Sequence, residues 1–403
     1  MVQAAAGATA GVDVAAIQAA LEAEGLDGWL LYDFHGSNPI ASEVTGAGRR
    51  GGHLATRRWY YLIPASGEPR GLVHAIERHV LAHLPGRIAV YAGRDQLESG
   101  LRELVRGVHR VAMEYSTNGA IPYLGRVDAG TIEQLRALGL DVTSSGDLVQ
   151  RFAAVWDQAA IDTHLQASEK LYRVKDRAFA AIRERMANGT PTTEYDIQEL
   201  MTRWFREEGM VSDSPPIVAA AGNAGNPHYM PTAAANRPIR HGEMVLLDLW
   251  AKLDRPGAVF ADITWVGYTG PRAPERYTKV FDTVAAARDT AVDVVQRAIR
   301  AGEPLYGWQV DRAASTVLRN AGFGANVLHR TGHSLGESVH GNGVNMDDYE
   351  THDDRRLLAG TGFTIEPGLY FDDFGVRLEI DMLVRERDAI VTGPIQKEIV
   401  ALG

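Results

Sequence analysis

The stretch EMVLLDLWA at residues 243–251 is apolar on both faces after Glu243, except at Asp248. A second apolar stretch, AVFADITWVGY at residues 258–268, contains Asp262 in the same setting. Both stretches have the length and composition of buried strands. An ionised carboxylate is rare inside such a strand unless it is paired or bound to a metal ion. The two stretches therefore predict buried strands whose acidic side chains need a compensating charge.

Two later stretches repeat this pattern. FTIEPGLYF at 363–371 contains Glu366, and GVRLEIDMLV at 375–384 contains Glu379. Taken alone, each carboxylate is also explained by pairing with a nearby arginine such as Arg377. Four carboxylates in apolar strands, however, would repel one another and lose their hydration, and divalent cations offset both effects best.

A histidine is the fifth candidate ligand. His333 lies in the glycine-containing stretch HRTGHSLGESVHG at 329–341. The chain has no cysteine, so a metal would have to be held by oxygen and imidazole ligands. Four carboxylates and one imidazole suit two divalent ions, with Mn²⁺ favoured and Co²⁺ or Zn²⁺ as alternatives. Two ions roughly 3.5–4 Å apart can share a bridging hydroxide and support hydrolysis.

Composition limits the class of protein. At 403 residues with 45% hydrophobic content, the chain is long enough for two cores. Its net charge of -10 argues against nucleic acid or an anionic membrane surface as a partner. The first residues do not have the pattern of a signal peptide, and no apolar run reaches the length of a membrane span. We therefore expect a cytoplasmic protein.

The order of the elements predicts two domains. Residues 1–155 alternate strand-like and helical patterns, which favours a small α/β domain, whereas residues 156–403 favour an α+β domain with an antiparallel sheet. A capping-box pattern, Thr193 followed by Asp196, marks one helix start. Helices are expected at 14–24, 96–105, 157–186, 193–209, 274–300 and 308–320, and strands at 28–33, 58–65, 71–76, 87–92, 110–115, 243–250, 258–268, 362–366 and 374–385.

Six motifs in order then suggest a family. They resemble those of the pita-bread metallopeptidases, the methionine aminopeptidase and creatinase superfamily, and most closely its Xaa-Pro dipeptidase (prolidase) and aminopeptidase P branch. The resemblance implies a pita-bread C-terminal domain, a creatinase-like N-terminal domain and a homodimer. The motifs are NPHYMP (226–231), VLLDLWA (245–251), FADIT (260–264), HRTGHSLG (329–336), FTIEPGLY (363–370) and GVRLE (375–379).

The resemblance implies a role for each candidate ligand. Asp248 would hold one ion through both carboxylate oxygens, and Asp262 and Glu379 would bridge the two ions. His333 and Glu366 would complete the second ion. Glu366 would also take the proton from the nucleophilic water, a position suited to a proton shuttle.

Further residues are expected around the substrate. The resemblance implies that His228 and His340 contact the scissile carbonyl and steady the tetrahedral intermediate. Arg377 is expected to orient a bridging carboxylate or the water network. Tyr229 and Met230 are candidates to pack against the substrate proline.

Selectivity for a dipeptide requires a cation for the free carboxylate, and arginine matches a carboxylate best. The pattern leaves several candidates open. They are Arg49, Arg50, Arg57 and Arg58 in the first domain, reaching the site in cis or from a partner subunit, and Arg355 and Arg356 in the second.

Five positions depart from the family pattern, and none is a candidate ligand. Phe260 replaces a common tyrosine and removes a hydroxyl, and Gly341 replaces the usual glutamate after the second histidine. The other departures are Trp250, Trp265 and Ile380. These changes indicate a reshaped pocket around an intact ligand set.

The leading hypothesis is a dinuclear metal-dependent hydrolase that cleaves the Xaa-Pro bond of dipeptides. One alternative is an aminopeptidase P acting on longer Xaa-Pro peptides, and another is a C–N hydrolase of the creatinase or ectoine hydrolase type. A third alternative is a partner-binding protein without catalysis. The complete set of ligands favours a metallopeptidase over the last two.

Overall fold

The structure is a computed structural model that describes residues 12–47 and 55–403. The chain divides into two compact units, Met1–Ala153 and Ala154–Gly403, so the second unit begins two residues before the expected position. Arg49 and Arg50 lie outside the described residues. Within the described ranges, no helix is long and apolar enough to cross a membrane.

The first unit is built on one mixed sheet. Its strand order is β4-β3-β2-β1-β5-β6, with antiparallel pairing of β1 with β2 and of β2 with β3, and parallel pairing elsewhere. Helices and apolar clusters cover both faces, which explains why every residue of β1 and β2 is buried. The described elements are α1 (Val14–Glu24), β1 (Gly28–Asp33), α2 (Pro39–Thr45), β2 (Trp59–Pro64), β3 (Arg70–His74), η1 (Arg78–Val80), β4 (Arg87–Tyr91), α3 (Arg94–Leu104), β5 (Arg110–Met113), η2 (Thr117–Gly119), η3 (Pro122–Leu124), α4 (Ala129–Ala137), β6 (Asp141–Ser144) and α5 (Gly146–Ala153).

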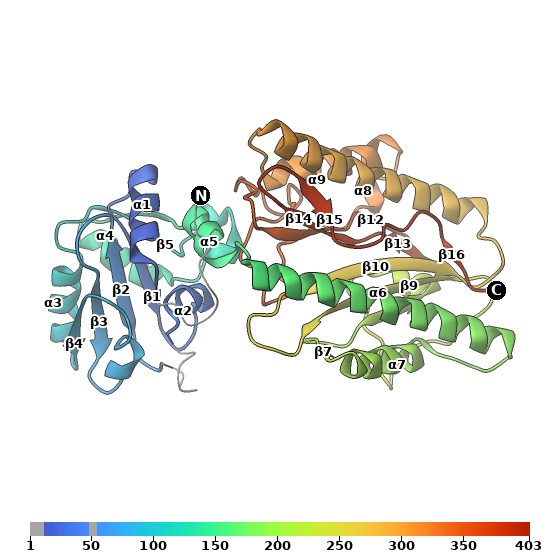
Figure 1. The fold of residues 1–403 in the computed structure, drawn as a ribbon, viewed down its shortest axis with the longest axis horizontal. Helices are drawn as coiled ribbons and strands as arrows, with labels where there is room; N and C mark the ends of the chain where they lie inside the picture. The colour runs from blue at the N-terminus through green and yellow to red at the C-terminus, as the bar shows by residue number, and fades with distance from the viewer. Residues whose placement is uncertain (1–11, 48–54) are drawn as a thin grey trace. The chain divides into compact units, whose positions relative to one another are not determined.

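The second unit combines long helices with three sheets (Figure 1). The largest sheet has the order β16-β10-β9-β7, and β8 also pairs with β9. The others are β11-β14-β15 and the hairpin β12-β13. The elements are α6 (Gln158–Ala187), α7 (Glu194–Glu207), β7 (Met210–Val211), β8 (Ile217–Ala220), η4 (Ala221–Gly225), β9 (Met244–Leu253), β10 (Ala261–Tyr268), α8 (Glu275–Ala301), α9 (Gly307–Asn320), η5 (Gly324–Asn326), β11 (Gly362–Ile365), β12 (Gly368–Tyr370), β13 (Gly375–Arg377), β14 (Ile380–Val384), β15 (Ala389–Val391) and β16 (Val400–Ala401).

The expected helices of the second unit are present. The α7 start has the predicted capping box, because the Thr193 hydroxyl accepts the Asp196 N–H and the Asp196 carboxylate accepts the Thr193 N–H. The expectation of an antiparallel sheet is wrong at one edge. There β10 pairs with β16 in parallel, Gly267 lying opposite Val400, because the C-terminal segment returns along the outer edge of β10.

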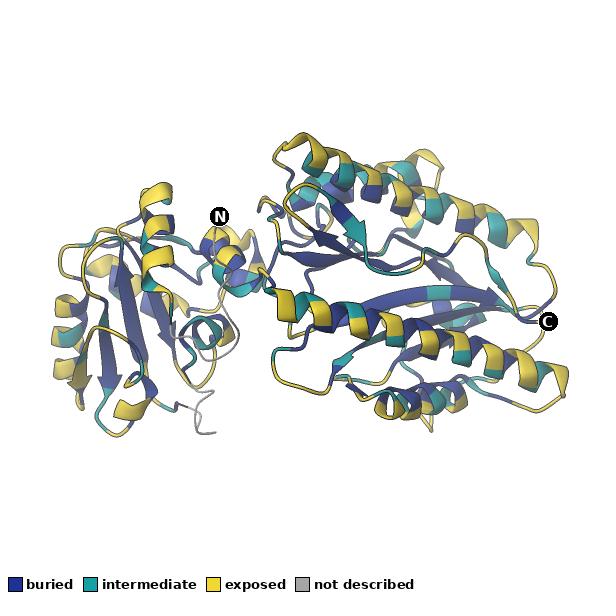
Figure 2. Ribbon diagram, in the orientation of Figure 1, coloured by how far each residue is buried: buried dark blue, intermediate teal, exposed yellow. Residues whose placement is uncertain are grey.

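Strand β9 is apolar on both faces because helices cover the sheet from two sides. Val245, Leu247 and Leu249 pack in a cluster with residues of α6 and α7. Met244 and Leu246 point the other way, into a cluster shared with α8, α9 and β11–β14. Figure 2 shows these strands as almost continuously buried between helices with exposed outer faces. The alternation of side chains places residue 248 on the face of Leu246.

Candidate metal centre

Strand register brings the two aspartates to one face of the large sheet. Asp248 pairs with Thr264 and Asp262 pairs with Trp250 in the antiparallel β9–β10 ladder. Directly opposed residues share a face, as do residues two apart along a strand. Asp248, Asp262 and Thr264 therefore converge, and both aspartates are buried.

The two glutamates come from the neighbouring sheet. Ile365 and Ile380 form the last pair of the β11–β14 ladder, and Glu366 and Glu379 are the next residues beyond that pair. Glu379 is buried, and Glu366 receives the Thr364 hydroxyl at 3.1 Å. A single antiparallel pairing thus accounts for how these two carboxylates meet.

His333 reaches the same place from a loop. Its backbone N–H donates to the Thr364 hydroxyl at 3.0 Å, and its Nδ1 lies 3.1 Å from the carbonyl oxygen of Ser334. Because a carbonyl only accepts, Nδ1 carries the proton and Nε2 offers a lone pair. Burial lowers the pKa of His333 to about 3, so the imidazole is neutral, as a metal ligand must be.

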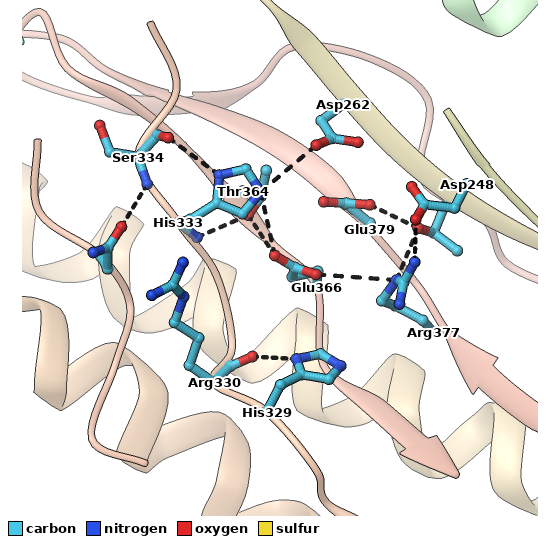
Figure 3. A network of polar contacts seen from close by, with 12 residues as sticks. Asp248, Asp262, His329, Arg330, His333, Ser334, Thr364, Glu366, Arg377 and Glu379 are labelled. Atoms are coloured by element: carbon cyan, nitrogen blue, oxygen red, sulfur yellow. Dashed lines mark hydrogen bonds and ion pairs between the residues drawn. The ribbon is translucent and has the colours of Figure 1, made fainter. Parts of the chain in front are cut away.

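The geometry fits a metal ion. Asp262, His333 and Glu379 each place one ligand atom within 4.8 Å of the other two (Figure 3). The His333 Nε2 lies 3.6 Å from Asp262 Oδ2 and 3.5 Å from Glu366 Oε1. These separations are too long for hydrogen bonds but close to those of two ligands that each lie about 2.1 Å from one ion.

The protein alone leaves this cluster uncompensated. Asp262 Oδ1 is buried and has no hydrogen-bond partner within the described residues. Burial, together with the neighbouring carboxylates, raises the pKa of Asp262 and of Glu379 well above its usual value. A divalent cation would satisfy the orphaned oxygen and stabilise both ionised forms.

Asp248 lies beside this three-residue cluster rather than within it. Arg377 pairs directly with Asp248 (Figure 3). Its Nε also donates to the Thr264 hydroxyl at 3.0 Å, which in turn donates to Glu379 Oε2 at 2.7 Å. Arg377 thus orients Asp248 by contact and reaches Glu379 only through Thr264.

The two candidate substrate histidines differ in position. His340 stacks edge-on against His333, with ring centroids 4.4 Å apart. His228 follows η4 on an exposed segment, where its backbone N–H donates to the Asn226 side chain at 3.0 Å. Only His340 is in ring contact with a candidate ligand within the described residues, and the role of both histidines stays a prediction.

A residue missed in the sequence fixes the segment with His228 and Tyr229. Glu194, fully buried at the start of α7, accepts the Tyr229 hydroxyl at 2.6 Å. It also accepts backbone N–H groups of Ala220 at 2.7 Å and Arg237 at 2.9 Å. The Tyr229 hydroxyl is therefore engaged, although its ring can still contact a substrate. The sequence gives no sign of this role, because Glu194 is an acidic residue in the first turn of a helix, where such residues are common.

A second missed residue supports Asp262. Asp381 is buried and accepts the Asp262 backbone N–H at 3.0 Å. His164, itself fully buried, lies 3.8 Å from Asp381 and is within 2.7 Å of the Phe260 carbonyl oxygen. The sequence signal that could have identified Asp381 is its position in an apolar strand, two residues after Glu379.

Arg355, one of the open candidates for the substrate carboxylate, is engaged within the protein. Its Nε and Nη2 donate to the Asp353 carboxylate at 2.9 and 2.6 Å, and its Nη1 donates to the Asn342 carbonyl at 3.1 Å. The side chain is only 3% exposed. Arg355 therefore braces the loop. In the other unit, the Arg57 guanidinium donates to Thr56.

The structure explains two of the departures from the family pattern. A Cβ at Gly341 would lie 2.7 Å from the Leu335 carbonyl, so this backbone has no room for the usual glutamate. The Trp250 indole N–H donates to Asp213 at 2.8 Å, a contact that a glycine could not make. Phe260 packs in a small apolar cluster with Leu335 and Trp156.

Replacing Gly332 by alanine is expected to damage the site and the fold together. A Cβ at this position would lie 2.0 Å from the Thr364 carbonyl oxygen, which is backbone and cannot swing away. We expect a loss of about 1–3 kcal/mol in the free energy of unfolding, as for other overpacked sites, and weaker metal binding because His333 shifts. Chemical denaturation and metal titration measure both; unchanged stability and unchanged metal affinity would contradict the predicted clash.

Comparison with known proteins gives the class. The sequence profile of metallopeptidase family M24 matches residues 164–386, and the chain belongs to this family. The second unit has the pita-bread fold, and the protein is a metallopeptidase, as the motifs predict.

The chain is also similar to individual dipeptidases and prolidases. The chain is 26% identical over 355 residues to a probable dipeptidase PepE of Mycobacterium tuberculosis, covering 85% of this chain and 84% of that protein. It is 30% identical over 202 residues to an Xaa-Pro dipeptidase of Lactobacillus helveticus, covering 50% and 49%. Among solved structures, dipeptidase PepE from Mycobacterium ulcerans superposes with a TM-score of 0.71 at 23% identity, covering 96% of both chains. A prolidase from Thermococcus sibiricus gives 0.67 at 22% identity, covering 98% and 100%.

Proposed function

We propose that this metallopeptidase hydrolyses the Xaa-Pro bond of dipeptides with two divalent ions, Mn²⁺ being the favoured metal. The observation that carries the proposal is the convergence of Asp262, His333 and Glu379 within 4.8 Å, flanked by Asp248 and Glu366. The names of the relatives, dipeptidase and Xaa-Pro dipeptidase, support the substrate class. We also propose a homodimer, which the resemblance supports, and a cytoplasmic location.

The proposed ligand roles follow the sequence-based assignment. Asp248, Asp262, His333, Glu366 and Glu379 would hold the ions. When bound, the ions supply Lewis acidity and lower the pKa of the water that attacks the substrate. The chain's own residues hold these ions, orient the peptide and move the proton.

Glu366 is the proposed proton acceptor. Burial raises its pKa, but the neighbouring imidazoles of His333 and His329, and after them Arg377, outweigh burial and hold the pKa below its usual value. The carboxylate is therefore ionised at neutral pH and can accept a proton from water and deliver it to the leaving nitrogen. The Thr364 hydroxyl, 3.1 Å from Glu366 Oε1, keeps the carboxylate in place.

A panel of substrates tests the proposal. Protein loaded with Mn²⁺ is expected to release proline from Ala-Pro and to act more weakly on the tripeptide Ala-Pro-Ala and on Ala-Ala. Chelation of the metal is expected to abolish release, and readdition to restore it. Turnover of the tripeptide but not of the dipeptide would favour the aminopeptidase P alternative. No turnover of any peptide by protein with a measured full metal content would overturn the peptidase proposal and favour a creatinase-type C–N hydrolase.

A further inference from the structure

A row of three side chains crosses the large sheet from its β7 edge to the metal centre. Val211 pairs with Lys252 in the β7–β9 ladder, and the same register continued along the chain brings Asp213 level with Trp250. Trp250 in turn pairs with Asp262 in the β9–β10 ladder. Opposed residues share a face, and adjacent strands lie about 4.8 Å apart, so Asp213 lies on the metal face at about 10 Å from Asp262.

The side chain of Trp250 orients this carboxylate. Its indole N–H donates to Asp213 Oδ1 at 2.8 Å. The ring is partly buried and packs against the apolar cluster of Phe260 and Leu335, which limits its movement. Asp213 itself is exposed. An exposed carboxylate is thus held in one direction by a donor that is anchored in the protein.

The other oxygen of Asp213 is available to a ligand. Across the described ranges of the chain, Oδ2 makes no hydrogen bond and no ion pair. Lys252 shares the face of Trp250 on β9, but its Nζ donates to the Glu337 carbonyl oxygen at 2.6 Å and lies 5.2 Å from the centre of the Phe260 ring. Asp213 is therefore oriented by a neutral donor and keeps a side that a cation can approach.

A second observation places Asp213 beside the metal centre. Burial and the charge of Arg330 lower the pKa of His340, whereas Glu366 and then Asp213 raise it. The His340 ring in turn lies 4.4 Å from the ring of His333. Asp213 is thus within electrostatic reach of the histidine that touches a candidate ligand, in agreement with its place in the strand register.

A substrate group that meets Asp213 must extend away from the scissile bond. The α-ammonium group of a peptide is attached beside the scissile carbonyl of the first residue and stays close to the metal ligands. A lysine or arginine side chain on that residue reaches further, which suits the separation of about 10 Å between Asp213 and Asp262. Its apolar stem can lie against the indole of Trp250 while its charged end meets the carboxylate.

We propose that Asp213, oriented by Trp250, selects substrates whose first residue has a lysine or arginine side chain. This inference rests on the proposed peptidase function and names a substrate class within it. An ion pair at an exposed carboxylate contributes modestly, because solvent screens the charges. The role of Asp213 is therefore a preference among dipeptides, and dipeptides with a neutral first residue remain substrates.

Two dipeptides of similar shape test the preference. Steady-state kinetics of Mn²⁺-loaded protein are measured on Lys-Pro and on Met-Pro, whose side chains are similar in length and differ in charge. The wild-type protein is expected to prefer Lys-Pro. Asp213→Asn keeps an oxygen for the Trp250 N–H and removes the charge. It is expected to lower kcat/KM for Lys-Pro about 3- to 10-fold, mainly through KM, and to affect Met-Pro much less, so the preference falls.

Two further variants complete the test. Trp250→Phe keeps an aromatic ring but not the N–H, and it is expected to lose part of the preference; an unchanged preference would overturn the orienting role of Trp250. Asp282→Asn, which removes the same charge at an exposed position of α8, is the control and should match the wild type.

The possible failures are distinguishable. A wild-type protein without a preference for Lys-Pro, or an unchanged preference in Asp213→Asn, would overturn the role of Asp213. Equal losses on both dipeptides in Asp213→Asn would also overturn it, because they would place the carboxylate at the α-ammonium group or in a structural role. Failure of the wild-type protein to cleave either dipeptide would instead overturn the proposed function.

Discussion

The Glu366→Gln variant is expected to lose about 10²–10⁴-fold in kcat, the usual contribution of a positioned acid–base group. The amide keeps an oxygen that can face an ion, but it cannot accept a proton from water. Because the carboxylate of Glu366 is held ionised beside His333, its loss removes proton transfer rather than substrate binding. KM for the dipeptide should therefore change much less than kcat.

The control for this experiment is Glu303→Gln, which changes the same charge at an exposed position after α8. It should retain wild-type kinetics. Metal content of both variants is measured so that a lost ion is not mistaken for a lost proton acceptor. A Glu366→Gln variant with full metal and a kcat within threefold of the wild type would show that another group moves the proton.

The Asp262→Asn variant is expected to lose measurable turnover and, when metal-free, to be more stable than the wild type at pH 8. In the metal-free folded protein, burial raises the pKa of Asp262 well above the unfolded value near 4. The folded state then binds this proton more tightly than the unfolded state. The stability it contributes is present at low pH and is lost as the pH rises through the folded pKa.

The cost at high pH is about 1.4 kcal/mol for each unit by which the pKa is raised. Asparagine carries no such penalty, and the other buried groups, Glu379 and His333 among them, are common to both proteins. Thermal unfolding in the presence of a chelator should show the variant above the wild type at pH 8 and a smaller difference at pH 5. For a unit of this size, each kcal/mol corresponds to about 2–4 °C in Tm.

Added Mn²⁺ should reverse the order. Ligand that binds only the folded state stabilises it by mass action, and the wild type offers the complete set of ligands. A metal-free variant that is less stable than the wild type at pH 8 would contradict the view that Asp262 is destabilising without its ion. Equal stabilisation of both proteins by Mn²⁺ would contradict its place in the metal site.

Much of this centre can be predicted from the amino-acid sequence alone. Acidic residues inside apolar strands are costly, so Asp248, Asp262 and Glu379 are informative when they are taken together. The Thr193 capping box and the long helices follow from local periodicity in the same way. These features depend on neighbours within a few residues, which the sequence displays directly.

The partners of these residues could not be predicted. Arg355 is a candidate for the substrate carboxylate by its position in the sequence, but in the structure it is paired with Asp353. In the sequence, Glu194 resembles an ordinary residue of a first helical turn, yet in the structure it accepts the hydroxyl of Tyr229 and holds that segment in place. Which arginine pairs with which carboxylate depends on long-range packing, and this pairing cannot be predicted from the spacing of residues along the chain.

By itself, the sequence predicts the kind of centre: four carboxylates and an imidazole in apolar surroundings, without cysteine, suit divalent cations. The tertiary structure alone decided how these residues meet. The reason is physical. The charge of a buried carboxylate must be compensated in any fold, so an acidic residue in an apolar stretch can be recognised from its neighbours in the sequence. Strand register and loop packing decide which group compensates it. The β9–β10 and β11–β14 ladders, for example, bring Thr264 to Glu379, which lies 115 positions further along the chain.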